Sequence, residues 1–414
     1  MDRDLRGICL AAGIRTFGAA LYSPFLALFL QATLGVGYFA IGLIIFGVGA
    51  VQLPFGYVGG LLTDRIGRRP LIILGLVGEA ALTALLAYAF EIRSLPGAIA
   101  AALVGGILVT IAGPAVSAYI ADLASGSART VAFTWFRIGF NAGFAAGAAL
   151  GGLLTAAFGF APAVAAGAAI IGGGAVFFVL TVAPSPFDVR RAARPGTAPD
   201  PAHPPRPTVS MGASLRLLVR DRVALELLVA FALVSLVAGQ WAVTFPLFTH
   251  NGLGVSYAVL GFGLALNGIV VVVGQRPTTQ AVLGWRHTTI AALGLALYAV
   301  AFVGLAAAGV YEIAPVALFF VAVVVLSVGE NLIAIPQSTL PSNLAPAAEV
   351  GSYNGAFGTI GNLGFLVSVV LGGWALATVH DPLVLWGILV APAIPAAWLL
   401  HDSAARMGRD ANRA

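Results

Sequence analysis

The chain has 414 residues, of which 60% are apolar and 9% are charged, and its mean hydropathy is +0.99. This composition excludes a soluble globular protein. The net charge of +5 comes from arginines alone, and these lie in short segments between apolar runs, which argues against a nucleic-acid-binding protein.

Taken in chain order, the apolar runs predict an all-α membrane protein with twelve transmembrane helices. Most runs exceed the roughly 20 residues that a helix needs to cross a bilayer. The first run is long enough to span, so we interpret it as a helix and not as a cleavable signal. The eighth run is the weakest, because Gln275, Arg276 and Pro277 are expected to end it early. The predicted spans are 8–31, 38–60, 70–90, 97–121, 130–154, 160–183, 223–249, 256–275, 287–308, 314–340, 352–378 and 383–400.

A short polar stretch between the second and third spans concentrates three arginines and one aspartate within six residues. Two spans joined this tightly must form an antiparallel hairpin, with the charges at one membrane face. The pattern Gly-x-Leu-x-Asp-Arg-x-Gly-Arg-Arg resembles the signature loop of the major facilitator superfamily. The glycines and charged residues that match it are Gly60, Asp64, Arg65, Gly67, Arg68 and Arg69.

This resemblance implies a cytoplasmic latch. In that family the aspartate of the loop docks against the start of the eleventh helix when the cytoplasmic side is closed, which implies a contact between Asp64 and the region of Gly351 and Ser352. Arg68 could then pair with Asp122 at the end of the fourth span. The simpler alternative is that these charges only orient the hairpin in the membrane.

The fifth span contains a row of glycines. Gly143, Gly147, Gly151 and Gly152 follow a pattern similar to the antiporter motif of the family, except that Ala148 stands where the family has a helix-bending proline. Glycines at this spacing allow another helix to approach closely. The two alternatives are therefore plain helix packing and a motif associated with export.

A stretch rich in proline and arginine divides the chain into two repeats. Eight prolines lie between residues 184 and 207, which predicts a flexible linker, and residues 214–220 are expected to form a short amphipathic helix on the membrane surface. On both sides of it the pattern Asn-x-Gly-Phe recurs 221 residues apart, beginning at Asn141 and Asn362. Such repeats are typical of the two parallel halves of this family. The expected domains are a six-helix bundle over 1–183, a cytoplasmic linker over 184–222 and a second six-helix bundle over 223–414.

The arginines predict the orientation. An even number of spans puts both termini on one side, and 18 of the 21 arginines lie on that side. Because basic residues concentrate in cytoplasmic loops, both termini are expected in the cytoplasm, with the protein in the cell's inner (plasma) membrane.

Four charged residues lie inside spans: Arg15, Glu79, Arg137 and Glu330. Each would be costly against lipid, so each is expected to face the bundle interior or a water-filled cavity. Arg15, Glu79 and Arg137 lie at similar depths and could form one layer, either as a structural ion-pair network or as part of a substrate or proton site. In the family, helices 1, 4, 7 and 10 line the central cavity, which implies that Arg15 faces it and that Glu79 is its structural partner.

Glu330 and Asn331 lie in the tenth span, where the resemblance implies a cavity helix. No basic residue lies inside the C-terminal spans. A carboxyl group there could exchange a proton between the two sides of the membrane, or it could be a neutral group hydrogen-bonded within the bundle. Asn141 and Gln240 complete the candidate cavity residues.

The sequence therefore predicts a secondary active transporter that works by alternating access. Resemblance to the drug-efflux branch implies proton-coupled export of hydrophobic or drug-like small molecules by a monomer. One alternative is uptake or exchange of a small organic anion bound by Arg15 and Arg137, and another is a non-transporting receptor or lipid-handling protein of the same fold. No enzyme activity, cofactor, metal or nucleic acid is expected, since Cys9 is the single cysteine, the histidines are isolated and no phosphate-binding loop follows a strand.

Overall fold

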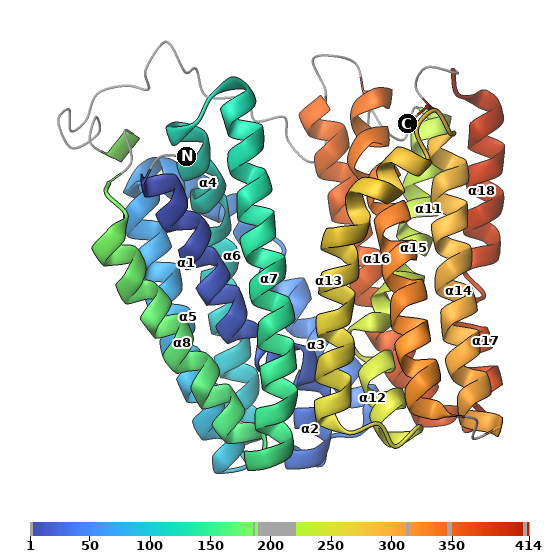
Figure 1. The fold of residues 1–414 in the computed structure, drawn as a ribbon, viewed down its shortest axis with the longest axis horizontal. Coiled ribbons are helices and arrows are strands. Elements are labelled where there is room, and N and C mark those ends of the chain that lie inside the picture. The colour runs from blue at the N-terminus through green and yellow to red at the C-terminus, as the bar shows by residue number, and fades with distance from the viewer. Residues whose placement is uncertain are drawn as a thin grey trace. The chain divides into compact units, whose positions relative to one another are not determined.

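The computed structural model describes residues 3–184, 187–188, 221–311, 314–345, 350–408 and 412–413. Within these ranges the named elements are all helices (Figure 1). Twelve helical segments are long and apolar enough to cross a membrane, which confirms the predicted all-α fold and the number of spans. Most of the linker, and with it the helix expected over 214–220, lies outside the described residues.

Spans 1 to 6 are formed by nine helical elements. Span 1 combines α1 and α2 through a short 3₁₀ turn, η1, and span 2 combines α3 and α4, which meet at Pro54. A proline lacks the backbone N–H that a continuous helix needs, so both spans break where a proline occurs. The elements are α1 (Arg3–Ala20), η1 (Ser23–Phe25), α2 (Leu26–Leu34), α3 (Tyr38–Gln52), α4 (Phe55–Ile66), α5 (Arg68–Glu91), α6 (Leu95–Leu123), α7 (Gly126–Phe158) and α8 (Phe160–Thr181).

Spans 7 to 12 are also formed by nine elements. Span 7 joins α11 to α12 through the 3₁₀ turn η2, and span 12 joins α17 to α18 at Pro392. The elements are α11 (Arg222–Ala238), η2 (Gly239–Trp241), α12 (Thr244–Asn251), α13 (Tyr257–Ala281), α14 (His287–Tyr311), α15 (Pro315–Leu344), α16 (Val350–Thr378), α17 (Pro382–Val390) and α18 (Ala393–Arg406).

The eighth span is longer than expected. Helix α13 continues through Pro277 to Ala281, so the expectation that this proline ends the span near residue 275 was wrong. Prolines are tolerated inside spanning helices where side chains satisfy the freed backbone groups.

Contacts between residues divide the chain into two compact units. Unit 1 comprises Met1–Gly37, Ile44–Ala198 and Ser256–Ile269. Unit 2 comprises Tyr38–Leu43, Pro199–Val255 and Val270–Ala414.

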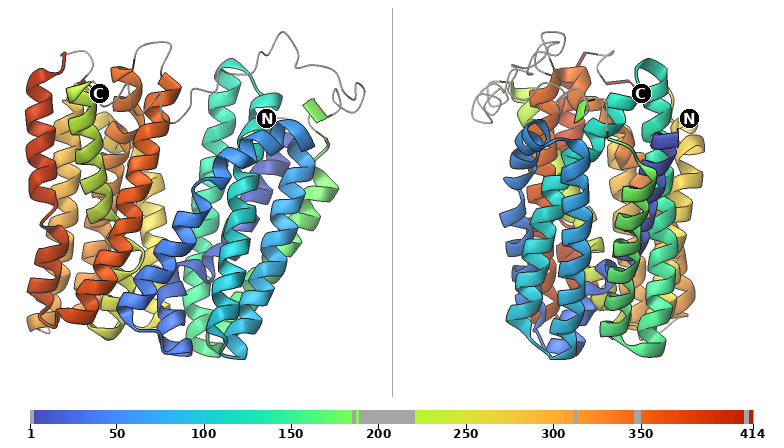
Figure 2. Two further views of the ribbon diagram at one scale, coloured as in Figure 1. Left: turned by 180° about the vertical axis from the view of Figure 1, so that it is seen from behind. Right: turned by 90° about the vertical axis from the view of Figure 1, so that its left-hand side faces the viewer.

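In unit 1, α5 lies between α6 and α8, and α1 packs on α7 and α8 (Figure 2). The glycine row of α7 faces the backbone of α1. A Cβ atom built on Gly143, Gly147 or Gly151 would lie 2.3 Å from a carbonyl oxygen of α1 or of the residue that follows it, so only glycine allows the two segments to meet at this distance. The carbonyl oxygens belong to Gly13, Phe17 and Leu21, in that order. Gly152, next in the row, faces a different neighbour: a Cβ atom on it would lie 2.4 Å from the carbonyl oxygen of Tyr257.

Unit 2 repeats this crossing and adds an aromatic core. A Cβ atom on Gly364 of α16 would lie 2.3 Å from the carbonyl oxygen of Ala232 in α11. Trp386 is fully buried, stacks on Phe302 with ring centres 4.5 Å apart, and meets Phe248 edge-on at 5.5 Å. Within the described residues its indole nitrogen has no hydrogen-bond acceptor.

Candidate functional site

The signature loop is a tight connection between two helices. Helix α4 ends at Ile66 and α5 begins at Arg68, so Gly67 alone joins them. Its φ of +108° lies in the region that side chains disfavour, which explains why a glycine stands here. A Cβ atom at this position would also lie 2.5 Å from the Asp188 carboxylate.

Arg68 connects three parts of unit 1. Its Nε lies 3.1 Å from Asp122 Oδ2 at the end of α6, and its Nη1 lies 3.2 Å from Asp64 Oδ1. Nη1 also donates to the carbonyl of Thr63 at 3.0 Å, and the ring of Phe187 covers the guanidinium at 3.4 Å. Only 10% of the Arg68 side chain is exposed, so the cation is held by anions and an aromatic face together.

Asp188 caps α5, and sequence reasoning missed it. The backbone N–H groups of Arg68 and Arg69 donate to its two carboxylate oxygens at 2.7 and 3.1 Å. The N-terminal N–H groups of a helix have no partner within the helix, so a carboxylate here supplies them with acceptors. Its negative charge also interacts favourably with the positive end of the helix dipole. Asp188 lies 120 residues beyond Arg68, and no spacing rule links the two positions.

Arg69 ties the same loop to α8. Its Nε and Nη2 donate to the carbonyls of Val182 and Val179 at 2.9 and 2.8 Å, where the last carbonyls of a helix have no partner of their own. Tyr119, fully buried on α6, likewise donates to the carbonyl of Ala183. The loop, the end of α8 and the first residues after it therefore form one cluster.

Unit 2 has a corresponding cap at the start of α14. The backbone N–H of His287 donates to the carbonyl of Asn412 at 2.9 Å, and that of Thr288 donates to Asn412 Oδ1 at 3.2 Å. The Asn412 amide donates in turn to the Thr288 hydroxyl at 3.2 Å. Asp188 follows α8, the last span of the first half, and caps α5, the third span of that half. In the same way Asn412 follows α18 and caps α14, the third span of the second half.

The other latch residues differ in their surroundings. Arg65 is exposed, and the Asp64 side chain is 73% exposed. Gly60 has open space around it, whereas a Cβ on its neighbour Gly59 would lie 2.3 Å from the carbonyl oxygen of Ile111, so Gly59 makes the close helix contact.

The expected docking of Asp64 stays a prediction. Asp64 belongs to unit 1 and the start of α16 belongs to unit 2. Gly351 and Ser352 lie in the first turn of α16, and the side chain of Ser352 is outside what the structure describes.

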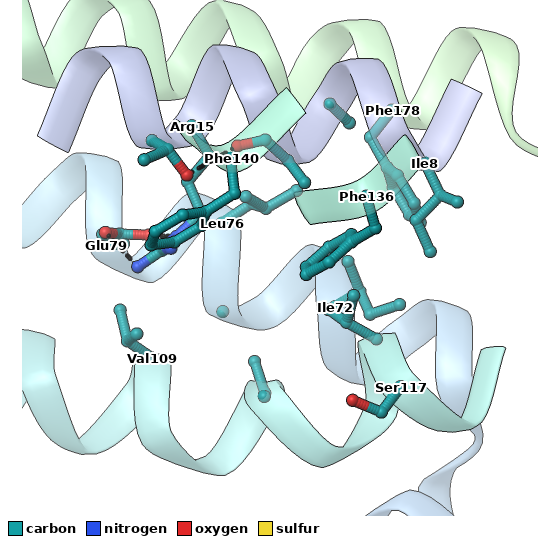
Figure 3. A pocket seen from close by; sticks show the side chains of 17 residues that line it. Ile8, Arg15, Ile72, Leu76, Glu79, Val109, Ser117, Phe136, Phe140 and Phe178 are labelled. Atoms are coloured by element: carbon teal, nitrogen blue, oxygen red, sulfur yellow. Dashed lines mark hydrogen bonds and ion pairs between the residues drawn. The ribbon is translucent and has the colours of Figure 1, made fainter. Parts of the chain in front are cut away.

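A cavity of about 190 Å³ opens inside unit 1 (Figure 3). Its walls come from α1, α5, α6 and α7, with Phe178 contributed by α8. The lining is largely apolar, and three phenylalanines contribute to it. The larger side chains around the cavity are Ile8, Arg15, Ile72, Leu76, Glu79, Val109, Val116, Phe136, Phe140 and Phe178.

Arg15 and Glu79 form a two-pronged ion pair at the cavity wall. Arg15 Nε lies 2.6 Å from Glu79 Oε2, and Arg15 Nη2 lies 2.9 Å from Glu79 Oε1. The Glu79 side chain is 7% exposed and the Arg15 side chain 27%. Such parallel N–H···O bonds fix both side chains in orientation as well as in distance. Figure 3 shows the pair on one side of the cavity and Ser117 on the other.

Arg137 and Asn141 lie on α7, one turn apart. The Asn141 amide donates to the Arg137 carbonyl at 2.9 Å, so it bonds within its own helix. Arg137 is exposed and is not among the residues that line the cavity, although Phe136 beside it is. The cavity thus contains the Arg15–Glu79 pair without Arg137.

Gln240, Glu330 and Asn331 lie in unit 2. Gln240 is fully buried within the helix packing: its amide donates to the carbonyl of Ser368 at 3.2 Å, and its Oε1 accepts from the Thr244 hydroxyl at 2.6 Å. On α15, Glu330 is exposed, whereas Asn331 is buried and donates to the carbonyl of Val270 at 3.4 Å.

Metal chemistry finds no support in the described part of the chain, where no three histidine, cysteine, aspartate or glutamate side chains gather. The chemistry that the cavity offers is ionic and apolar. Such a lining can bind a small molecule.

Comparison with known sequences identifies one family. The sequence pattern of the Major Facilitator Superfamily matches residues 8–369. An uncharacterised MFS-type transporter of Mycobacterium tuberculosis is 30% identical over 64% of this chain, and the chain spans 58% of that relative's length. The uncharacterised MFS-type transporter YttB of Bacillus subtilis is 25% identical over 100% of this chain and 98% of its own length.

Solved structures show the same fold at low sequence identity. An auto-inhibited peptide transporter of the POT family aligns over 98% of both chains with a TM-score of 0.76 and 20% identity. The nucleoside transporter NupG aligns over 96% of this chain and 99% of its own with a TM-score of 0.76 and 14% identity. At this level of identity the likeness concerns the fold alone.

Proposed function

Because the chain belongs to the major facilitator superfamily, we propose that it is a secondary transporter that exports small hydrophobic molecules by alternating access, driven by the proton gradient. The Arg15–Glu79 pair in the wall of an apolar, aromatic cavity carries this proposal. A buried carboxyl group is suited to take up a proton when its ion pair opens and to release the proton when the pair forms again, as cargo binds and leaves.

Two carboxyl groups compete for the proton role. Glu79 lines the cavity and is nearly buried, which favours it. Glu330 is exposed on α15 of unit 2, next to the buried Asn331. Arg137 and Asn141 lie on α7, a helix of the first glycine crossing, and Gln240 lies in the turn η2 that follows α11. None of the three lines the cavity, so we assign them a supporting role.

The cluster around the signature loop is proposed to act as the latch between transport states. Arg68 binds Asp64 and Asp122 simultaneously, so movement of α6 would break an ion pair that is mostly shielded from water, and movement of α4 would break one whose aspartate is exposed. The exposed Asp64 carboxylate retains the capacity to meet another helix start, as the family resemblance implies.

The protein is a multi-pass membrane protein with twelve spans. We further propose that both termini and the linker over 184–222 lie on the cytoplasmic side of the inner membrane, because the arginines concentrate in these segments and in the loops on the same side. The two six-helix bundles, 1–183 and 223–414, would then be the moving bodies of a monomer.

Flux in proteoliposomes tests the function. An imposed pH gradient should drive movement of a lipophilic fluorescent dye by the unmodified protein above the rate of protein-free vesicles. Glu79→Gln should abolish the dependence on the gradient, whereas Glu91→Gln, on the exposed end of the same helix, should not. Glu330→Gln decides the competing assignment, because loss of gradient dependence there alone would move the proton role to unit 2. Absence of any flux would contradict the proposal.

A second candidate is carriage of a small organic anion. The observation that favours it is that Arg15 lines the cavity and, although it is paired with Glu79, keeps 27% of its side chain exposed, so that a cationic group can be reached by an anion.

A further inference from the structure

The Arg15–Glu79 pair leaves part of the guanidinium unused. A guanidinium has five N–H donors. Glu79 occupies one on Nε and one on Nη2, so two on Nη1 and one on Nη2 remain. Among the described residues, no further acceptor bonds to them. The outer edge of Arg15, formed by Nη1 and Nη2, therefore has the geometry that a second carboxylate needs.

The remaining polar groups of the cavity make this edge its strongest binding element. Thr16 already donates to the carbonyl of Ala12 at 2.8 Å. Ser117 is exposed at the far side of the cavity (Figure 3). Apart from these two residues and the Arg15–Glu79 pair, the lining is apolar, so a ligand meets the ion pair with its cationic edge and an apolar, aromatic surface.

The volume limits the ligand. A cavity of about 150 Å³ holds benzene. The cavity of about 190 Å³ beside Arg15 fits one aromatic ring with a short substituent, and Phe136, Phe140 and Phe178 offer faces and edges against which such a ring packs.

The charges fix the stoichiometry. Arg15 and Glu79 together are neutral, so a bound carboxylate would leave one uncompensated negative charge in a poorly solvated site. Two carboxylates on one guanidinium avoid this cost when they share one proton. Binding of the acid is then electroneutral: one proton is taken up from solution and forms an O–H bond on one of the two carboxylates, and no bond between heavier atoms changes.

We propose that this cavity binds small aromatic monocarboxylic acids, with the carboxylate on the outer edge of Arg15 and one proton taken up with each acid. The inference rests on the proposed function, because it names the cargo of the same cavity, and it sets the direction for that cargo: acid and proton cross together, so an inward proton gradient drives uptake of the acid, as in the organic-anion candidate, and not its export. It unites the hydrophobic cargo with the anionic one: the ring supplies the apolar surface and the acid supplies the charge.

Other titratable groups near Glu79 do not compete for the proton. Helix α8 contains no charged residue, and the single charged residue of α6, Asp122, binds Arg68. Between α1 and η1, Tyr22 shares a hydrogen bond of 3.2 Å with Thr83, one turn from Glu79. Asp64 and Arg65 are at the end of α4.

Equilibrium binding of benzoate tests the inference without requiring transport. Calorimetry on the purified full chain should show benzoate binding with uptake of about one proton, measured as the difference between buffers of different ionisation enthalpy. Benzyl alcohol, which has the ring without the charge, should bind without proton uptake. In Glu79→Gln, benzoate should still bind, but the proton uptake should fall to zero.

Variants of Arg15 separate the charge from the fold. Arg15→Met removes the cation but leaves Glu79 without its partner, so the matched variant is Arg15→Met with Glu79→Gln, which is neutral. This double variant should bind benzoate at least about tenfold more weakly, since a hydrogen-bonded charge pair is lost. Its affinity for benzyl alcohol should stay within about twofold.

Equal benzoate affinity in the double variant, or unchanged proton uptake in Glu79→Gln, would overturn the inference. The two proposals fail in different ways. Gradient-driven flux of a neutral dye without benzoate binding removes the acid as cargo and keeps the transporter. Proton-linked benzoate binding without flux of any solute keeps the site and removes the transport function.

Discussion

The two units share one helix crossing but differ in what lies beside it. In unit 1, Gly143 packs on the carbonyl of Gly13, and in unit 2, Gly364 packs on that of Ala232. Two residues beyond these carbonyls, α1 carries Arg15 and α11 carries Val234, which is fully buried. The same backbone contact therefore supports a charged cavity wall in one unit and a sealed apolar core in the other.

The polar groups near the crossings differ in the same way. Unit 2 buries a neutral network in which Gln240 bonds Thr244 and Ser368. Unit 1 has an ion pair of which Arg15 remains 27% exposed. Neutral groups that hydrogen-bond one another leave no polar atom of the core without a partner. An ion pair at a cavity wall, by contrast, keeps part of a charged group accessible to a ligand. The difference agrees with our proposal that the binding site lies in unit 1.

Exchanging these side chains should give the largest effect. Val234→Arg places an unpaired cation in a sealed core, and we expect a loss of ~3–5 kcal/mol of stability, the usual cost of a buried charge without its partner. Thermal unfolding in detergent measures it. The reciprocal change, Arg15→Met with Glu79→Leu, should leave the unfolding temperature close to that of the unmodified protein. Equal destabilisation by both changes would contradict the comparison.

The shared crossing should respond equally in both units. Gly143→Ala and Gly364→Ala each bring a Cβ to 2.3 Å from a backbone oxygen, which forces the helices apart. We expect each to cost about 1–3 kcal/mol, as overpacking does. Gly173→Ala on α8 is the matched control, because its Cβ would meet nothing within 4 Å. The same thermal unfolding measurement applies, and a much larger effect in one unit would show that the crossings are not equivalent.

The helix caps should give the smallest effect. Asp188→Ala removes acceptors from the first N–H groups of α5, and Asn412→Ala removes one from α14. Losing a cap costs about 0.5–2 kcal/mol. Hydrogen exchange at the first turns of α5 and α14 should accelerate locally, each in its own variant. Faster exchange spread over a whole unit would show that the residue holds more than one helix end.

The twelve spans were predictable because crossing a membrane is a property of composition and length alone. The nearness of Arg15 and Glu79 was expected from their similar depths. The hydrogen bond of 2.6 Å from Arg15 Nε to Glu79 Oε2 depends on side-chain geometry, which the sequence does not supply. Asp188 and Asn412 escaped prediction, since a cap formed across more than a hundred residues has no local pattern. The choice between Gly59 and Gly60 depended on which face of α4 meets α6, and two adjacent glycines give no periodicity to decide it.

Trp386 gives the protein an optical signal of its own. An indole ring buried among apolar side chains, whose N–H has no acceptor among the described residues, is expected to emit at short wavelength until water reaches it. Unit 1 contains a single tryptophan, Trp135, which is half exposed. A red shift of the intrinsic fluorescence in denaturant should therefore follow the opening of unit 2, so the melting of one unit can be observed without attaching a label to either.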